Sequence, residues 1–174
     1  DGDHAWRFSR AAWASLLDQA SRAAELVLVD TAAGLQAVTT SVLRQCDDVL
    51  GVLQAEALGA RSFQSLTRFL DQFAEQGRPR LGGIVVNMFQ YQAGGSQALV
   101  HDALKGLPAG IVMQPVFPRD PVLLEATSYG VPVAFLDRHG PPTLHGVFDR
   151  LAADLSTRLG VNRRTGRSVA PFLD

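Results

Sequence analysis

The sequence predicts an α/β fold in which a parallel β-sheet is covered by helices on both faces. Short, almost unbroken apolar segments alternate with longer segments whose apolar residues recur every three or four positions. Strands that are apolar on both sides are typical of parallel sheets buried between two layers of helices. The 174 residues, 47% of them hydrophobic, are enough for one soluble domain with a sizeable core.

The first half of the chain contains two predicted strands and three predicted helices. Apolar residues repeat at helical spacing over residues 11–24. The buried strand Leu26–Val29 is expected next, followed by a helix near 36–45 and a second buried strand, Val49–Leu53. A long amphipathic helix then carries its apolar stripe over residues 58–73, until the letters GRPR break the pattern.

The second half continues the alternation. The letters GGIVVN form a third strand that ends at Asn87, and a helix is expected from Ser96 to Gly106, with glycine in its usual stop position. The remaining elements are a strand at 110–115, a short helix at Pro121–Tyr129, an extended piece at 131–135 and a closing helix that Gly160 ends. Residues 1–160 therefore form the predicted domain, and 161–174 an arginine-containing tail that we expect to be flexible.

Composition excludes several classes of protein. The formal net charge of −1 gives no overall attraction to nucleic acid or to an anionic membrane. No apolar run approaches the length of a membrane span, and the start shows no secretory pattern. Cys46 is the sole cysteine, which rules out an internal disulfide and a thiolate metal cluster. We therefore expect a cytoplasmic protein without membrane insertion, and Asp1 in place of a methionine suggests a fragment.

Ligands of parallel sheets bind at the carboxyl ends of the strands, so the residues after each predicted strand are the candidates for a site. They are 30–34, 54–56, 87–88 and 115–120. Asp30 directly follows four apolar residues, and one well-placed carboxylate is enough for Mg²⁺, which keeps several of its waters. The alternative is an aspartate that caps the following helix or turn.

Asn87 and the segment after the fourth strand are candidates for binding a base. An amide donates and accepts hydrogen bonds at once, which matches the N6/N7 edge of adenine; an asparagine that merely forms a turn is the alternative. Pro118 could pack on the face of a base while the backbone of Arg119 and Asp120 meets its edge. A plain proline turn is the alternative there.

Four blocks in order, LVLVDTAAGL, DDVLGVLQAEALGARSFQSLTRFL, GGIVVNMF and FPRDPVLLEATSYGVPVAFLD, resemble the ParA/MinD family of deviant-Walker ATPases. The last block is most similar to ParA-type partition ATPases, and the resemblance spans roughly residues 11–159. It implies a P-loop NTPase fold of the SIMIBI type, with Asp30 holding Mg²⁺ through a water. Thr31 to Leu35, Gly34 included, correspond to the switch region that senses the γ-phosphate, so Asp30, Thr31 and Gly34 are the implied catalytic residues. The implied adenine-binding residues are Asn87, Pro118, Arg119 and Asp120.

The resemblance also implies a function for the full-length protein. It would bind ATP with Mg²⁺, form a homodimer on ATP binding, respond to a partner protein that stimulates hydrolysis, and position cargo such as DNA partition complexes. Ala32 and Ala33 stand where many ParA proteins carry prolines, which leaves the ParA, cellulose-synthase-operon and flagellar-placement subfamilies open. Arg163, Arg164 and Arg167 could contact DNA phosphates, or belong to a solvated tail. A degenerate, non-catalytic interaction module with the same fold is the rival hypothesis.

The phosphate-binding motif G-x-x-x-x-G-K-[ST] does not occur in these residues. In the family that the chain resembles, this loop follows a central strand beside the strand that ends in the magnesium aspartate. We therefore expect the chain to correspond to the C-terminal two-thirds of such an ATPase, and alone neither to bind ATP tightly nor to hydrolyse it. Without the central strand, the backbone of its two neighbours would be unpaired and open to pairing with another chain.

Overall fold

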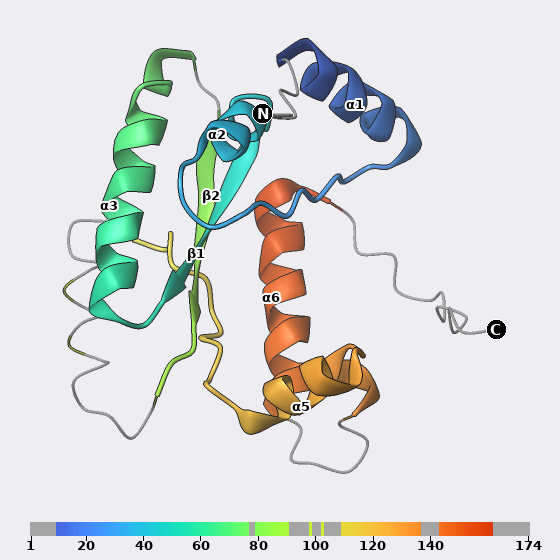
Figure 1. The fold of residues 1–174 in the computed structure, drawn as a ribbon, viewed down its shortest axis with the longest axis vertical. Coiled ribbons are helices and arrows are strands. Elements are labelled where there is room, and N and C mark those ends of the chain that lie inside the picture. Colours follow the sequence, from blue (N-terminus) through green and yellow to red (C-terminus); the bar gives the residue numbers. More distant parts are fainter. Residues whose placement is uncertain are drawn as a thin grey trace, which may run out of the picture.

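The computed structural model describes residues 10–76, 79–90, 98, 102, 109–136 and 143–161. It confirms the predicted α/β class, with parallel strands between helices (Figure 1). The strands β1 (Asp48–Gln54) and β2 (Arg80–Asn87) form the centre, with helix α3 (Ala57–Asp71) on one face and α6 (Thr143–Leu159) on the other.

The sheet is parallel throughout its described part. β1 pairs with β2 in a register that places Gln54 beside Asn87. On the other side of β2, Ile84 forms a bridge to Val112, and beyond the strand Phe89 forms a bridge to Pro118. The strand predicted at 110–115 is thus reduced to isolated bridges. Prolines at 115 and 118 have no N–H to donate, which limits a regular ladder in this segment.

The described helices agree with the predicted ones. Besides α3 and α6 they are α1 (Arg10–Ala23), α2 (Ala37–Leu43) and α5 (Pro121–Tyr129), with short 3₁₀ turns at Ala74–Gln76 and Val133–Phe135. The 3₁₀ turn at Val133–Phe135 corrects the prediction of an extended piece at 131–135. None of the described helices is both long and apolar enough to cross a membrane. The helix predicted from Ser96 to Gly106 lies outside the described residues except for Ala98 and Asp102, and so does the tail beyond Val161.

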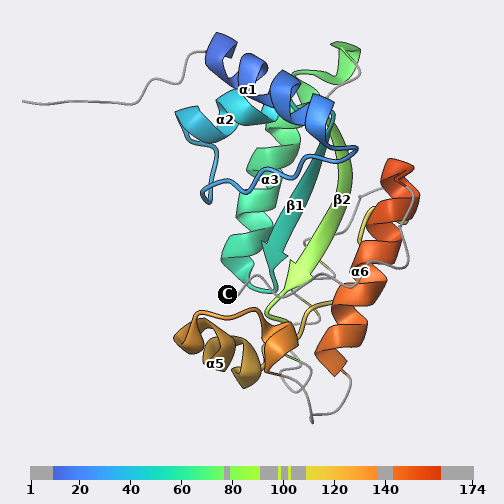
Figure 2. The same cartoon turned by 90° about the vertical axis from the view of Figure 1, so that its right-hand side faces the viewer.

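The prediction of a buried strand at Leu26–Val29 is wrong. Residues 24–36 form an extended connection between α1 and α2 that joins neither strand of the sheet, as Figure 2 shows. Leu28 is 72% exposed, and Leu26 is exposed as well. A strand is stable only when its N–H and C=O groups find partners, and no described segment supplies them to this one. Apolar composition alone therefore misled the prediction.

The core lies on both faces of the sheet. On the α3 face, Leu53 and Ile84 pack against Phe63. On the α6 face, the cluster contains Val85, Met113, Phe117 and Val147, with Leu50, Leu151 and Leu155 packed at its margin. These two clusters hold β2 and the segment 111–118 between the helices.

Gly83 lies where β2 and the segment 111–118 approach most closely. A Cβ atom added there would come within 2.8 Å of the Met113 sulfur, and Met113 is completely buried. We expect Gly83→Ala to lower the free energy of unfolding by about 1–3 kcal/mol, because the buried methionine must shift to admit the methyl group. Urea denaturation measures this. Gly146→Ala is the control, since a Cβ there meets only the far end of the Arg150 side chain at 3.4 Å.

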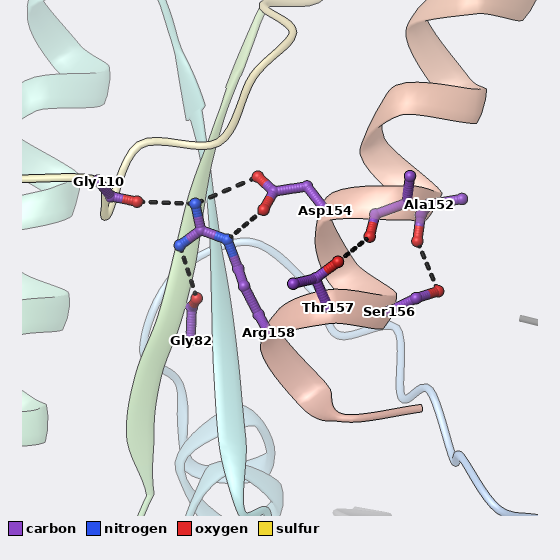
Figure 3. Close-up of polar contacts among 8 residues, drawn as sticks. Gly82, Gly110, Ala152, Asp154, Ser156, Thr157 and Arg158 are labelled. Atoms are coloured by element: carbon purple, nitrogen blue, oxygen red, sulfur yellow. Dashed lines mark hydrogen bonds and ion pairs between the residues drawn. The ribbon is translucent and has the colours of Figure 1, made fainter. Parts of the chain in front are cut away.

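Arg158 ties the C-terminal end of α6 to the sheet (Figure 3). Its Nε and Nη2 atoms donate to the Asp154 carboxylate at 2.7 and 3.1 Å. Nη2 also donates to the Gly110 carbonyl at 2.7 Å, and Nη1 to the Gly82 carbonyl at 3.4 Å. One guanidinium therefore joins α6, the start of β2 and the turn before residue 111, at the end of the sheet opposite the candidate site.

Candidate functional site

The ends of β1 and β2 meet the segment 115–120 at the carboxyl edge of the sheet. The N–H of Ala55, just after β1, donates to the carbonyl of Asn87 at 3.0 Å. Just after β2, the N–H of Phe89 donates to the Phe117 carbonyl at 2.9 Å, and the Phe89 carbonyl accepts from the N–H of Arg119 at 3.0 Å. Four groups, 30–34, 54–56, 87–88 and 115–120, were predicted to share one edge, and these bonds confirm it for the last three, whereas residues 30–34 follow no strand of the described sheet. Their role in binding stays a prediction.

Asn87 is held in an unusual turn. Its Oδ1 atom accepts a hydrogen bond from the N–H of Met88 at 2.8 Å. Met88 has a φ of 55°, in the left-handed region that residues other than glycine and asparagine seldom adopt. Among the described residues, the Nδ2 group of Asn87 has no hydrogen-bond partner, so its two N–H donors are available to a ligand. Strain of this kind is often found at binding sites, where the surrounding structure maintains it.

The loop at residues 118–120 is fixed by its own hydrogen bonds. Pro118 is partly buried beside Phe89, and the N–H of Arg119 is used by the Phe89 carbonyl. The Asp120 carboxylate caps α5 by accepting from the N–H of Val122 at 3.0 Å. The side chain of Asp120 therefore has a structural role, and any contact of this loop with a base would involve the Pro118 ring or the remaining backbone groups.

The predicted magnesium and switch residues lie in the extended connection between α1 and α2. Asp30, Thr31 and Gly34 are exposed. The following part of the connection is anchored, because Thr39 Oγ1 donates to the Ala32 carbonyl at 3.3 Å and Leu35 packs against the core cluster below α2.

Gly34 has a φ of 85°, and a Cβ there would meet nothing within 4 Å. Backbone conformation rather than lack of space therefore requires the glycine.

The structure shows no bond between the predicted magnesium residue, Asp30, and the predicted adenine-binding residues. No hydrogen bond or ion pair within the described residues connects Asp30 to Asn87 or Pro118. The Asp30 carboxylate is nevertheless an exposed, hard oxygen donor and suits Mg²⁺, for which one or two carboxylates are enough when water and phosphate supply the rest. No group of three or more His, Cys, Asp or Glu side chains that could hold a metal occurs in the described part of the chain.

One feature of this edge was missed from the sequence. The left-handed turn at Met88 follows Asn87 without any glycine, and nothing in the letters VVNMF distinguishes it from a regular strand end. An asparagine whose side chain accepts from the next N–H could have suggested a turn, but it does not specify which of the two residues takes the positive φ.

Comparison with known proteins identifies the fold. No family model and no curated protein matches the sequence. The structure is similar to the MinD cell division protein of Aquifex aeolicus, with a TM-score of 0.65 and 19% sequence identity over 89% of this chain and 62% of that chain. It is also similar to the MinC:MinD cell division protein complex of the same organism, with a TM-score of 0.62 and 16% identity over 91% of this chain. The chain thus has a MinD-like α/β fold and spans about 62% of the length of the MinD chains.

Proposed function

We propose that this chain is part of a ParA/MinD-like ATPase that binds ATP with Mg²⁺, dimerises and positions a cargo such as a DNA partition complex. The main support is the position of Asn87 beside the loop 118–120, at the carboxyl edge of a MinD-like sheet, where ligands of parallel sheets bind. The motif resemblance assigns the same residues to adenine. The fold and the motif resemblance both support this proposed location for the base.

In this proposal the residues divide into a base half and a phosphate half. Asn87 donates from Nδ2 to an adenine nitrogen, and the Pro118 ring packs on the base. Asp30 would hold Mg²⁺ through a water, while Thr31 to Leu35 form the switch region that senses the γ-phosphate. Mg²⁺ held by Asp30 would offset the negative charge that develops on the phosphate groups.

Transfer of the γ-phosphoryl group to water also needs an amide-lined loop with a lysine to cradle the phosphates. No segment of the 174 residues has that sequence. We therefore expect this chain alone to show no ATP hydrolysis.

The coding sequence upstream of residue 1 decides between this proposal and its rival. A Lys-Gly-Gly-x-Gly-Lys-Thr motif there, together with Mg²⁺-dependent ATP hydrolysis by the complete protein, supports the ATPase. A start codon directly before residue 1, with no hydrolysis, supports a non-catalytic interaction module of the same fold.

The partner and the cargo follow the same proposal. One of the similar structures is a complex of MinD with MinC, which supports assembly with a partner protein for chains of this fold. We propose a partner that stimulates hydrolysis and non-specific DNA contact through Arg163, Arg164 and Arg167, at positions outside the described residues. A cellulose-synthase-operon ParA-like protein is the alternative within the family. DNA affinity that falls steeply as salt rises would support the partition role.

Substitutions at Asn87 test the base half of the site. We expect Asn87→Asp in the complete protein to raise the Kd for ATP about tenfold, because a lost ligand hydrogen bond is worth about 1 kcal/mol or more. The aspartate retains an acceptor for the Met88 N–H, so the turn is preserved while both Nδ2 donors are removed. Asn87→Ala removes the turn bond as well and shows how much the turn contributes. Titration with a fluorescent ATP analogue measures both, and unchanged affinity of Asn87→Asp would contradict adenine recognition by this side chain.

A further inference from the structure

On the side away from β1, β2 pairs with the segment 111–118. In a parallel pair, a bonded residue reaches N–H and C=O groups that lie two positions apart on the neighbouring strand, so one residue lies between them. Ile84 follows this rule, because it donates to the Ile111 carbonyl at 2.9 Å and accepts from the Met113 N–H at 2.8 Å. This part of the pairing is therefore regular.

Phe117 departs from the regular spacing. Its N–H donates to the Val86 carbonyl at 2.8 Å, and its carbonyl accepts from the N–H of Phe89 at 2.9 Å. These two groups are three positions apart along the chain, so two residues, Asn87 and Met88, lie where a regular ladder has one. This is the arrangement of a β-bulge, which bends a strand and re-aims the side chains beside it.

The conformation of Met88 is imposed by its neighbours. Met88 has a φ of 55° although its side chain is 40% exposed. On one side of it, the Asn87 carbonyl accepts from the N–H of Ala55. On the other side, Phe89 is buried and bonded to Phe117. A left-handed conformation in a residue other than glycine persists only where the surrounding structure determines it, and such residues cluster at functional sites.

The bulge determines which way the Asn87 amide points. It brings the Met88 N–H within 2.8 Å of the Asn87 Oδ1 atom. If the amide were turned over, Nδ2 would face this N–H, and two donors cannot bond to each other. The backbone therefore holds Oδ1, and the N–H groups of Nδ2 remain for a ligand.

We propose that Met88 is a positioning residue for the base: its left-handed conformation, imposed by the bulge, fixes the Asn87 amide with Nδ2 available to the ligand. This inference rests on the function proposed above, in which Asn87 binds adenine, and adds the device that orients it. Met88 acts through its backbone and not through its thioether. An amide that is already fixed loses little freedom on binding, which raises the affinity for the base.

Met88→Val and Met88→Asn form a matched pair, because both remove the thioether and only one is compatible with the backbone. A β-branched residue is a genuine outlier at positive φ, whereas asparagine adopts the left-handed region several times more often than most residues. We expect Met88→Val to raise the Kd for ATP of the complete protein about tenfold, and Met88→Asn to change it by less than about twofold. Equal affinities of the two variants would overturn the proposal.

A double-mutant cycle shows whether Met88 acts through Asn87. Asn87→Asp already lacks both Nδ2 donors, so adding Met88→Val to it should raise the Kd for ATP no further. If Met88 instead supported only the loop 118–120, Met88→Val would weaken ATP binding equally with Asn87 and with Asp at this position. That result would refute the positioning role.

Hydrogen exchange of the Met88 N–H, measured in the complete protein without nucleotide, needs no substitution at Met88. We expect slow exchange in the parent protein and in Asn87→Asp, and fast exchange in Asn87→Ala, which lacks the acceptor. Fast exchange in the parent would refute the positioning role whether or not ATP binds. A protected N–H in a protein that binds no ATP would refute the proposed function, and with it the role of Met88 toward the base.

Discussion

Replacing Asp30 by asparagine in the complete protein is expected to lower Mg²⁺-dependent ATP hydrolysis by about 10- to 100-fold. Losses of this size are usual when a residue that holds a metal ion's ligands, such as a bound water, is replaced. Asparagine keeps the size of the side chain and one oxygen but loses the negative charge that holds the ion's water. The defect should become smaller at high Mg²⁺ concentration, because weaker binding is then compensated by mass action. A phosphate-release assay over a Mg²⁺ series measures both effects.

The control for this substitution is Asp71→Asn, which removes an exposed carboxylate from the end of α3, far along the chain from the connection that carries Asp30. It should leave the rate within experimental error of the parent protein. Equal rates for Asp30→Asn and the parent at low Mg²⁺ would contradict the magnesium role and leave Asp30 as an ordinary exposed residue of the connection between α1 and α2.

Replacing Arg158 by methionine is expected to lower the free energy of unfolding by about 2 kcal/mol. The Arg158 and Asp154 side chains are only 24% and 26% exposed, so their pair is better shielded from solvent than a surface ion pair. The substitution also leaves the carbonyls of Gly82 and Gly110 without their donor, and hydrogen bonds to a charged group are worth about 1.5–3 kcal/mol. Methionine preserves most of the apolar stem, which separates the loss of charge from the loss of packing.

Arg22→Met provides the comparison. Arg22 forms an ion pair with Asp18 at 2.8 Å and the same sequence separation, but on the exposed surface of α1. We expect its removal to change stability by less than about 0.5 kcal/mol. Urea unfolding of both variants gives the two values. If they are equal, the carbonyl contacts of Arg158 contribute nothing beyond a surface pair.

The helices were the most predictable part of this fold, because their limits are set locally. Asp120 and Pro121 begin α5 and Gly130 ends it with a φ of 66°, as the letters around them indicate. Gly160 likewise ends α6. The strands depend on neighbours that the sequence does not specify. Leu26–Val29 has the apolar character of a buried strand, yet it joins no sheet because no described segment pairs with it.

The candidate site shows the same difference between parts that could be predicted and parts that could not. The contact between residues after β2 and the loop 118–120 could be predicted, because parallel strands bring their carboxyl ends to one edge. The position of Asp30 could not be predicted in the same way, because the segment before it, Leu26–Val29, joins no strand of the described sheet. Met88 was missed because a positive φ in a residue other than glycine results from its surroundings and not from its own preference.

The two attachments of the segment 111–118 have a consequence for the proposed binding site. Arg158 holds β2 and residue 110 at one end, and the backbone bonds of Phe89 hold residues 117 and 119 at the other. These attachments involve neither β1 nor the connection that carries Asp30. The residues proposed to receive the base are therefore held in place independently of those proposed to receive the phosphates.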